Sequence, residues 1–513
     1  MFSRIFKRAS SFRSDERGVV LILFAVLMVP ILMLVALAID YGQFLVMKNQ
    51  LAASVDAAAL DVARFPNLTD DQALAKANAF VAANYPASTA IGTLQSLTVT
   101  RGTSTVDVTA VASLNTTFMK IAGVDTLSAN VHSQVVYQQN KLEVVLVLDN
   151  TGSMAAIAGT STKIDGLKTA ATELTNILFG SSDTSQFVKI GVAPFTAAVN
   201  VGPIYRNAAW IDSTGATMLT TENLDVPAGN SLFSLFDQFT NASWRGCVRQ
   251  RIEPYDLQET PPDPATPDTL FTPYFAPDEP DSGSFSNSYL RDGAPPPGNT
   301  PQAIQRNIAK YAGAALGNKE GPNTACPVKS ILRLSNQKQP VLDEINGMTP
   351  KGNTVIPAGL MWGWHLLSPN GPFGDGAPYS DEVTIKAIVL VTDGDNSING
   401  GGNGFNKSVF NSYGYAGAGG HLTIDPKASP EGNLNEKLLS LCANIQALKT
   451  SKNNPRIILY MIALGDDIDQ TAQSLLQQCA TDSTTYFTTS TTDALISTFQ
   501  SIAAGLNQLR VSK

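Results

Sequence analysis

The stretch LEVVLVLDNTGSM, residues 142–154, decides the fold prediction because a run of Val and Leu leads directly into a polar turn. Such a run is typical of a strand that a parallel sheet buries on both faces. The turn carries one carboxylate, Asp149, and two hydroxyls, Thr151 and Ser153. Taken alone, it could be an ordinary corner between a strand and a helix. The rest of the chain is needed to interpret these side chains.

Strand patterns and amphipathic helix patterns alternate from residue 142 to the C-terminus. After the first strand, further strands are expected at 186–195, 385–393, 456–465 and 484–489. Helices are expected at 163–180, 337–348, 356–367, 435–449, 470–479 and 492–509. This alternation predicts an α/β fold with a doubly wound, mainly parallel sheet over residues 140–513.

A different composition interrupts this pattern between about residues 201 and 329. The segment PYDLQETPPDPATPDTLFTPYFAPDEPDSG, residues 254–283, is dense in Pro and Asp. Such composition predicts a long irregular insertion on the surface, without a core of its own.

The N-terminal region contains 22 consecutive residues without a charge, Gly18 to Ile39. At about 1.5 Å per residue, a helix of this length crosses the hydrocarbon core of a bilayer. Basic residues precede the run, at Arg4, Lys7, Arg8, Arg13 and Arg17. The positive-inside rule therefore predicts a cytoplasmic tail (1–17), a transmembrane helix (18–39) and an exported remainder. A cleaved signal peptide, with a cleavage site in ALA at 36–38, is the alternative; the length of the run and the helical apolar pattern beyond it favour an uncleaved anchor.

Residues 40–138 are predicted to form a small α+β region. An Ala-rich helix continues to about residue 64, and a second helix, DDQALAKANAFVAANY, ends at Pro86. LQSLTVTRG, TVDVTAVASL and NVHSQVVYQ then show strand patterns.

Length and charge limit the function classes. A chain of 513 residues is expected to form two or three domains. Its net charge is -8 and no segment is strongly basic, which argues against a nucleic-acid partner.

The cysteines fit an exported location. Cys247, Cys326, Cys442 and Cys479 form no CxxC pair and are too widely spaced for a zinc knuckle, so disulfides are expected. Three connectivities are possible; Cys247 with Cys326 and Cys442 with Cys479 is favoured because each pair falls within one region. Free buried thiols in a cytoplasmic protein are the alternative.

Three polar clusters follow strands or precede a helix in the expected sheet. They contribute Asp149, Thr151 and Ser153, then Thr354 in KGNTVIPAGL, then Asp393 in IVLVTDGDN. In a doubly wound sheet, ligands bind beyond the carboxyl ends of the strands, so these side chains could converge. Carboxylate and hydroxyl oxygens favour Mg²⁺, with Ca²⁺ or Mn²⁺ as alternatives, over zinc or copper. An acidic residue of a partner protein, or water, could complete the ion's coordination.

DNTGSM, GNT and TDGDN, in this order, resemble the metal-ion-dependent adhesion site of von Willebrand factor A domains. That site usually opens with Asp-x-Ser-x-Ser; Thr151 replaces the first Ser and keeps its hydroxyl. The resemblance implies a von Willebrand factor A fold and a metal-assisted contact with a protein.

The segment ERGVVLILFAVLMVPILMLVALAIDYGQFLVMKNQLAASVDAAALDVAR, residues 16–64, resembles the anchor of TadG-like proteins of bacterial Tad (Flp) pilus-assembly systems. Such proteins join one pilin-like membrane helix to a periplasmic region that often holds a von Willebrand factor A domain. The resemblance implies a single-pass inner-membrane protein with its bulk in the periplasm or at the cell surface, in contact with other pilus-assembly components. Leu23 stands where pilin-like precursors often carry Glu, which argues against processing at Gly18.

An enzyme is the main competing class. The three histidines, His132, His365 and His421, lie in no nucleophile motif, and His365 falls on an apolar helix. Asp149 and Asp393 could form an acid and base pair, but the accompanying hydroxyls suit metal ligation better. The sequence thus predicts a non-enzymatic pilus-assembly or adhesion protein. The alternative is a purely structural, minor pilin-like component with a degenerate metal site.

Overall fold

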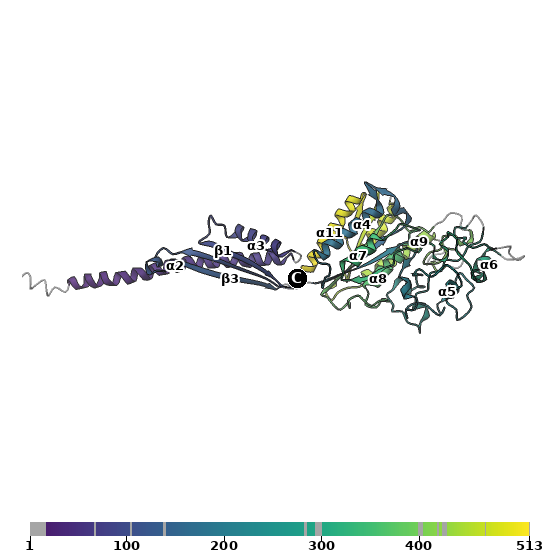
Figure 1. Cartoon of the computed structure of the whole chain (residues 1–513), viewed down its shortest axis with the longest axis horizontal. Coiled ribbons are helices and arrows are strands. Elements are labelled where there is room, and N and C mark those ends of the chain that lie inside the picture. Colours follow the sequence, from purple (N-terminus) through teal and green to yellow (C-terminus); the bar gives the residue numbers. More distant parts are fainter. Residues whose placement is uncertain are drawn as a thin grey trace, which may run out of the picture. The chain divides into compact units, whose positions relative to one another are not determined.

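The computed structural model describes residues 17–65, 68–102, 105–136, 140–281, 285–292, 300–398, 404–417, 420–422, 428–466 and 468–511. The chain forms two compact units, Met1–Gln139 and Asn140–Ser512, which are described separately (Figure 1). Residues 1–16 of the expected cytoplasmic tail lie outside the described residues.

The first unit combines two helices with an antiparallel sheet. Its elements are α2 (Arg17–Ala63), α3 (Asp70–Asn84), β1 (Thr93–Arg101), β2 (Thr105–Asn115), the 3₁₀ helix η1 (Met119–Ala122) and β3 (Thr126–Val136). The strand order is β1-β2-β3. Alternate residues of β2 are buried against the C-terminal half of α2, which contributes Leu51, Val55 and Val62 to the core. The α+β class predicted for this region is therefore confirmed.

A capping box starts α3. The Thr69 hydroxyl accepts a hydrogen bond from the Gln72 N–H at 3.2 Å, and the Gln72 side chain accepts one from the Thr69 N–H at 3.0 Å. These reciprocal bonds satisfy two N–H groups that a helix start leaves without an intrahelical partner.

The first half of α2 is apolar and exposed. The helix from Leu21 onward is long and apolar enough to cross a membrane, judged by length and composition, and none of its most apolar window is buried within the protein. Figure 1 shows this purple end of α2 continuing beyond the three-stranded sheet of the same unit. Pro30 lies inside the helix, which remains continuous from Arg17 to Ala63. Such a surface is stable in a bilayer and costly in water.

The second unit is built on an eight-stranded sheet with the order β13-β12-β11-β4-β7-β8-β9, in which β10 also pairs with β7. Its strands are β4 (Lys141–Asp149), β7 (Val188–Phe195), β8 (Val199–Asn200), β9 (Cys247–Val248), β10 (Leu332–Ser335), β11 (Thr384–Thr392), β12 (Ile457–Leu464) and β13 (Tyr486–Thr489). The strands β13, β12, β11, β4 and β7 are parallel neighbours, while β8, β9 and β10 pair antiparallel. The predicted doubly wound, mainly parallel sheet is confirmed; the three short antiparallel strands were not predicted.

Helices cover both faces of this sheet. The helices are α4 (Lys163–Phe179), α7 (Lys338–Asn346), α8 (Ile356–Leu367), α9 (Pro430–Gln446), α10 (Gln470–Cys479) and α11 (Thr492–Val511). Leu146 and Leu148 of β4 pack in the core with α4, α7 and α11, whereas Val145 and Val147 pack in the core with α8, α9 and α10. Successive side chains of a strand point to opposite faces, so one apolar strand serves both layers.

The segment 201–329 departs from the expectation of a surface insertion without a core. Within its described residues, Phe236, Phe271, Phe275 and Tyr311 are almost completely buried and share a core with α8. Short helices α5 (Leu232–Phe236) and α6 (Pro301–Arg306) lie in this segment. Its aromatic side chains supply a large buried apolar area, although its Pro and Asp content predicted that it would have no core of its own.

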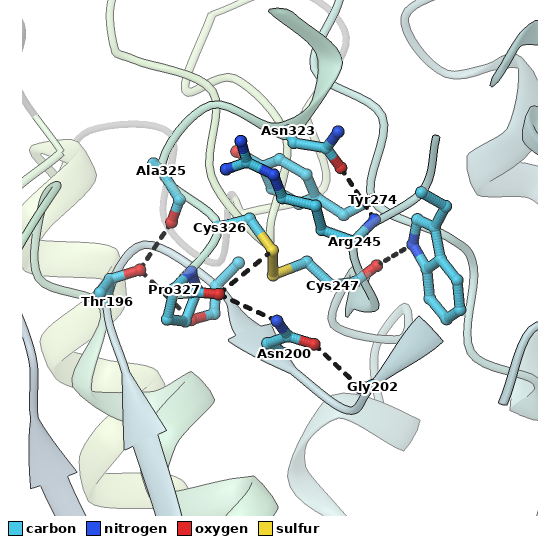
Figure 2. Close-up of a disulfide and its surroundings, with 12 residues drawn as sticks. Thr196, Asn200, Gly202, Arg245, Cys247, Tyr274, Asn323, Ala325, Cys326 and Pro327 are labelled. Carbon is cyan, nitrogen blue, oxygen red and sulfur yellow. Dashed lines mark hydrogen bonds between the residues drawn. A yellow bond between two sulfur atoms is a disulfide. The ribbon is translucent and has the colours of Figure 1, made fainter. Parts of the chain in front are cut away.

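Both disulfides are present, which confirms the expectation of disulfide bonds. They join Cys247 to Cys326 and Cys442 to Cys479. The first bridge lies beside β8, where the Asn200 amide donates to the Pro327 carbonyl at 2.9 Å (Figure 2). The second bridge joins α9 to the end of α10.

Candidate functional site

The polar residues after β4 and β11 meet at the carboxyl edge of the sheet, because these two strands are parallel neighbours. Asp149, the last residue of β4, is completely buried. Its Oδ1 accepts a hydrogen bond from the Thr151 N–H at 2.8 Å, and its Oδ2 accepts one from the Thr392 hydroxyl at 2.7 Å. Thr392 is a site residue that sequence reasoning missed, although it directly precedes Asp393.

A chain of hydroxyls joins this carboxylate to the second one. The Ser153 hydroxyl donates to Asp393 Oδ1 at 2.6 Å, and the Thr151 and Ser153 hydroxyl oxygens lie 3.0 Å apart. Either hydroxyl can be the donor in this Thr151–Ser153 pair. Four of the five sequence-predicted residues, Asp149, Thr151, Ser153 and Asp393, thus share one hydrogen-bonded cluster.

Thr354 lies on a loop that is hydrogen-bonded to the first turn. The Gly152 N–H donates to the Gly352 carbonyl at 2.9 Å, which fixes the two loops side by side. Thr354 itself is nearly buried, and its backbone pairs with Ser397 through two hydrogen bonds of 3.0 and 2.8 Å. The structure therefore places the loop of Thr354 beside the cluster through Gly352, while the backbone bonds of Thr354 itself go to Ser397.

Lys163 is the second residue that the sequence analysis missed. It is the first residue of α4 and is almost completely buried, with its Nζ 3.1 Å from Asp393 Oδ2. This ion pair places one positive charge next to the Asp393 carboxylate. A Lys ten residues after Ser153, at the start of the following helix, is the signal that could have pointed to it.

Burial controls the ionisation of Asp149. Loss of solvation and the negative charge of Asp393 together raise the pKa of its carboxyl to about 7, against the lowering effect of the Thr151 and Thr392 hydrogen bonds. The Asp149 carboxyl is thus poised to exchange a proton near neutral pH.

A second carboxyl at the same edge is perturbed. Burial and the neighbouring carboxylate of Asp469 raise the pKa of Asp395 to about 6. Asp469 caps α10 by accepting hydrogen bonds from two N–H groups of its first turn, which lowers its own pKa.

The donor set of the cluster fits a hard divalent cation. Two carboxylates and two hydroxyls supply oxygen atoms only, the ligand type that Mg²⁺ and Ca²⁺ prefer. Both side-chain polar atoms of the buried Asn150 lack a hydrogen-bond partner within the described part of the chain, so they remain able to form polar contacts. No group of three or more His, Cys, Asp or Glu side chains that could hold a metal ion occurs among the described residues.

The segment near the first disulfide supports the Thr354 loop. The Thr196 hydroxyl, just after β7, donates to the Ala325 carbonyl at 2.7 Å (Figure 2). The Thr196 carbonyl accepts from the Val355 N–H at 3.1 Å. Lys351, in the same loop, forms an ion pair with Glu320. The Cys247–Cys326 bridge therefore holds a segment that contacts both Thr196 and this loop.

The three histidines occupy separate environments. His132 is an exposed residue of the first unit, 3.0 Å from the Asp107 carboxylate. His365 is buried in α8, and desolvation together with the charge of Arg251 lowers its pKa well below the usual value. His421 Nδ1 lies 2.9 Å from the Glu222 carboxylate.

No curated protein shows a significant sequence match. Solved structures with some similarity include the pilus adhesin SpaC from Lactobacillus rhamnosus GG, with 11% identity, a TM-score of 0.33, and coverage of 82% of this chain and 35% of that one. This chain therefore spans about a third of the length of SpaC.

Two further solved structures contain a von Willebrand factor domain or a metal-ion-dependent adhesion motif. The von Willebrand factor domain of the type V pili tip protein Mfa5 from Porphyromonas gingivalis has 10% identity and a TM-score of 0.34, covering 73% of this chain and 97% of that one. Proximal thread matrix protein 1 from the mussel byssus, with a zinc-occupied metal-ion-dependent adhesion motif, has 13% identity and a TM-score of 0.28, covering 73% and 47%. The fold assignment for this chain rests on its own strand order and parallel pairings.

One family model matches the chain. Residues 18–64 match the family Tad, described as "Putative Flp pilus-assembly TadE/G-like". The match spans the apolar half of α2 and its continuation into the core of the first unit. Over this N-terminal segment, the chain is similar to TadE/G-like proteins.

Proposed function

We propose that the chain is a membrane-anchored protein of Tad (Flp) pilus assembly or adhesion. In this proposal residues 1–17 lie in the cytoplasm, residues 18–39 cross the inner membrane, and residues 40–138 form a pilin-like region. Residues 140–513 form a periplasmic or surface-exposed von Willebrand factor A domain that includes the insertion at about 201–329. The TadE/G-like match and the exposed apolar half of α2 support the anchor. The two disulfides support an exported location for the second unit.

The second unit is proposed to bind a protein partner through a divalent cation. Mg²⁺ is the proposed ion, with Ca²⁺ or Mn²⁺ as alternatives, and its proposed ligands are Asp149, Thr151, Ser153, Thr354 and Asp393. An acidic residue of another pilus-assembly component would complete its coordination, since a carboxylate is a strong ligand for such ions. The observation that carries this proposal is the hydrogen-bonded cluster of two carboxylates and two hydroxyls at the carboxyl edge of the sheet.

Calorimetric titration of the full-length protein with Mg²⁺, Mn²⁺ and Ca²⁺ tests the metal site. Wild type and Asp183→Ala should bind one ion with the same affinity, because Asp183 is an exposed residue whose backbone carbonyl accepts a hydrogen bond from Lys338. Asp149→Ala should abolish binding. Equal absence of binding in wild type and Asp149→Ala would reject the metal site.

The pilus role is tested in a bacterium that lacks the native gene. Complementation with wild type or Asp183→Ala should restore the normal number of surface pili or normal adhesion. Asp149→Ala, expressed and inserted at the wild-type level, should fail to do so. If this variant functions normally, the pilus role does not depend on a contact made through the metal.

A purely structural, minor pilin-like component is the second candidate. The ion pair of Lys163 with Asp393 favours it, because a buried ammonium already balances one of the two negative charges that would attract a cation. If the second candidate holds, Lys163→Met should leave pilus function intact while destabilising the fold. We do not propose a catalytic role. The two carboxylates are linked to hydroxyls in an arrangement suited to metal ligation. The contacts described for the three histidines are of a structural kind.

A further inference from the structure

The connection between β2 and β3 in the first unit exposes apolar side chains. This connection, residues 116–125, contains η1 and the sequence TTFMKIAGVD. Ile121 is 78% exposed, Phe118 39% and Val124 36%. A surface loop of a water-soluble unit seldom presents several large apolar residues together, so this group is expected to contact another apolar phase.

Asp40 ties this connection to α2 at the end of the apolar run. Its Oδ2 accepts hydrogen bonds from the N–H groups of Phe118 and Met119 at 2.8 and 2.6 Å, and its Oδ1 accepts one from Thr117 at 3.2 Å. Asp40 directly follows Ile39 and is itself buried. Because side chains of a helix lean toward its N-terminus, the carboxylate holds the connection beside the apolar turns that precede it.

A groove of about 510 Å³ lies between the two segments. Its walls are side chains of α2 between Val29 and Ile39, and Phe118, Met119, Ile121 and Ala122 of the connection. From Val29 to Ile39 the helix rises about 15 Å, which is roughly half the thickness of the hydrocarbon core. If the uncharged run from Gly18 to Ile39 spans the membrane, this groove lies in the half of the bilayer next to Asp40.

We propose that the η1 turn is embedded in this leaflet, with Phe118, Met119 and Ile121 among lipid acyl chains that fill the groove. This inference rests on the proposed anchoring of residues 18–39. It extends the membrane contact from a single helix to a helix with a docked turn. The exposed Lys120 on the same turn is long enough to reach the anionic headgroups.

The backbone of the connection is suited to a medium of low polarity, where unpaired N–H groups are costly. Asp40 accepts from three consecutive N–H groups, as described above. The N–H groups of Ile121, Gly123 and Val124 donate to carbonyls of Phe118, Lys120 and Met119 at 3.0 to 3.1 Å. The turn thus satisfies these donors without water.

A nitroxide scan of the full-length protein in phosphatidylcholine and phosphatidylglycerol vesicles tests the proposal. The four native cysteines form disulfides, so single Leu32→Cys, Ile121→Cys and Val136→Cys variants can be labelled specifically. All three replaced side chains are more than half exposed, so the variants should fold. Val136 is the matched control, since it is an exposed aliphatic residue at the far end of β3 from the connection.

The measurement is the ratio of label accessibility to oxygen, which concentrates among acyl chains, over that to a water-soluble nickel complex. The logarithm of this ratio should be positive for Leu32→Cys and Ile121→Cys and negative for Val136→Cys. A negative value for Ile121→Cys beside a positive value for Leu32→Cys would overturn the embedded turn while leaving the anchor intact. A negative value for Leu32→Cys would overturn the anchor and the embedded turn together.

A second copy of the chain could also cover the groove. In that case the Ile121 label would be shielded from both reagents, and its spectrum would show spin–spin broadening that disappears on dilution with unlabelled protein. This outcome would overturn the lipid contact in favour of a protein interface.

Discussion

The affinity of the proposed site for Mg²⁺ should depend on pH because of Asp149. Burial raises the pKa of this carboxyl to about 7 in the metal-free protein. A cation binds the carboxylate and must displace the proton, so the affinity is highest well above pH 7 and is lost as the pH falls through 7. With a pKa of about 7, the protonated fraction is roughly a tenth at pH 8 and nine tenths at pH 6. The apparent dissociation constant should therefore rise about tenfold between pH 8 and pH 6, equivalent to about 1.4 kcal/mol.

Calorimetric titration of the full-length protein at pH 6, 7 and 8 measures this dependence directly. Repeating the pH 7 titration in buffers with different ionisation enthalpies gives the number of protons released, which should be about one half per bound ion. Asp183→Asn should reproduce the wild-type profile, and Asp149→Asn should bind no ion at any of these pH values.

Two results would refute the reasoning. An affinity that is equal at pH 6 and pH 8, with no proton release, would mean that Asp149 is already ionised despite its burial. Lys163, whose Nζ lies 3.1 Å from Asp393 Oδ2, would then be the group whose charge offsets the burial. Unchanged binding by Asp149→Asn would show that the ion binds elsewhere.

Three further predictions concern the stability of the second unit, each measured by urea unfolding. Gly363→Ala in α8 should destabilise the protein by about 1–3 kcal/mol despite the better helix propensity of Ala, because its Cβ would lie 2.4 Å from a side chain of β4. The double substitution Cys442→Ser with Cys479→Ser should cost about 4 kcal/mol, since the bridge closes a loop with a sequence separation of 37; no change relative to wild type without reductant would contradict this. Glu143→Gln should cost about 3–5 kcal/mol, because Lys386 is completely buried with its Nζ 2.6 Å from the Glu143 carboxylate; adding Lys386→Met should recover most of this loss.

The sequence by itself determined the fold class and the position of the long apolar helix near the N-terminus. The continuous apolar strand at 142–148 and the alternation of strands and helices after it are local patterns, and local patterns report which faces are buried. The same reasoning located Asp149, Thr151, Ser153 and Asp393, because side chains at the carboxyl ends of adjacent parallel strands meet at one edge.

Tertiary structure alone decided what surrounds those residues. Lys163 reaches Asp393 from a different element, and Thr392 reaches Asp149 across two paired strands. Neither contact produces a periodic pattern in the sequence, since each depends on how α4 and β11 pack beside β4. The prediction for the insertion was wrong for the same reason. Composition indicated a surface segment, whereas Phe271 and Phe275 are buried in the core that contains α8. Composition alone does not show this packing. Burial of a side chain follows from the packing of distant elements, and that packing also raises the pKa of Asp149 toward neutrality.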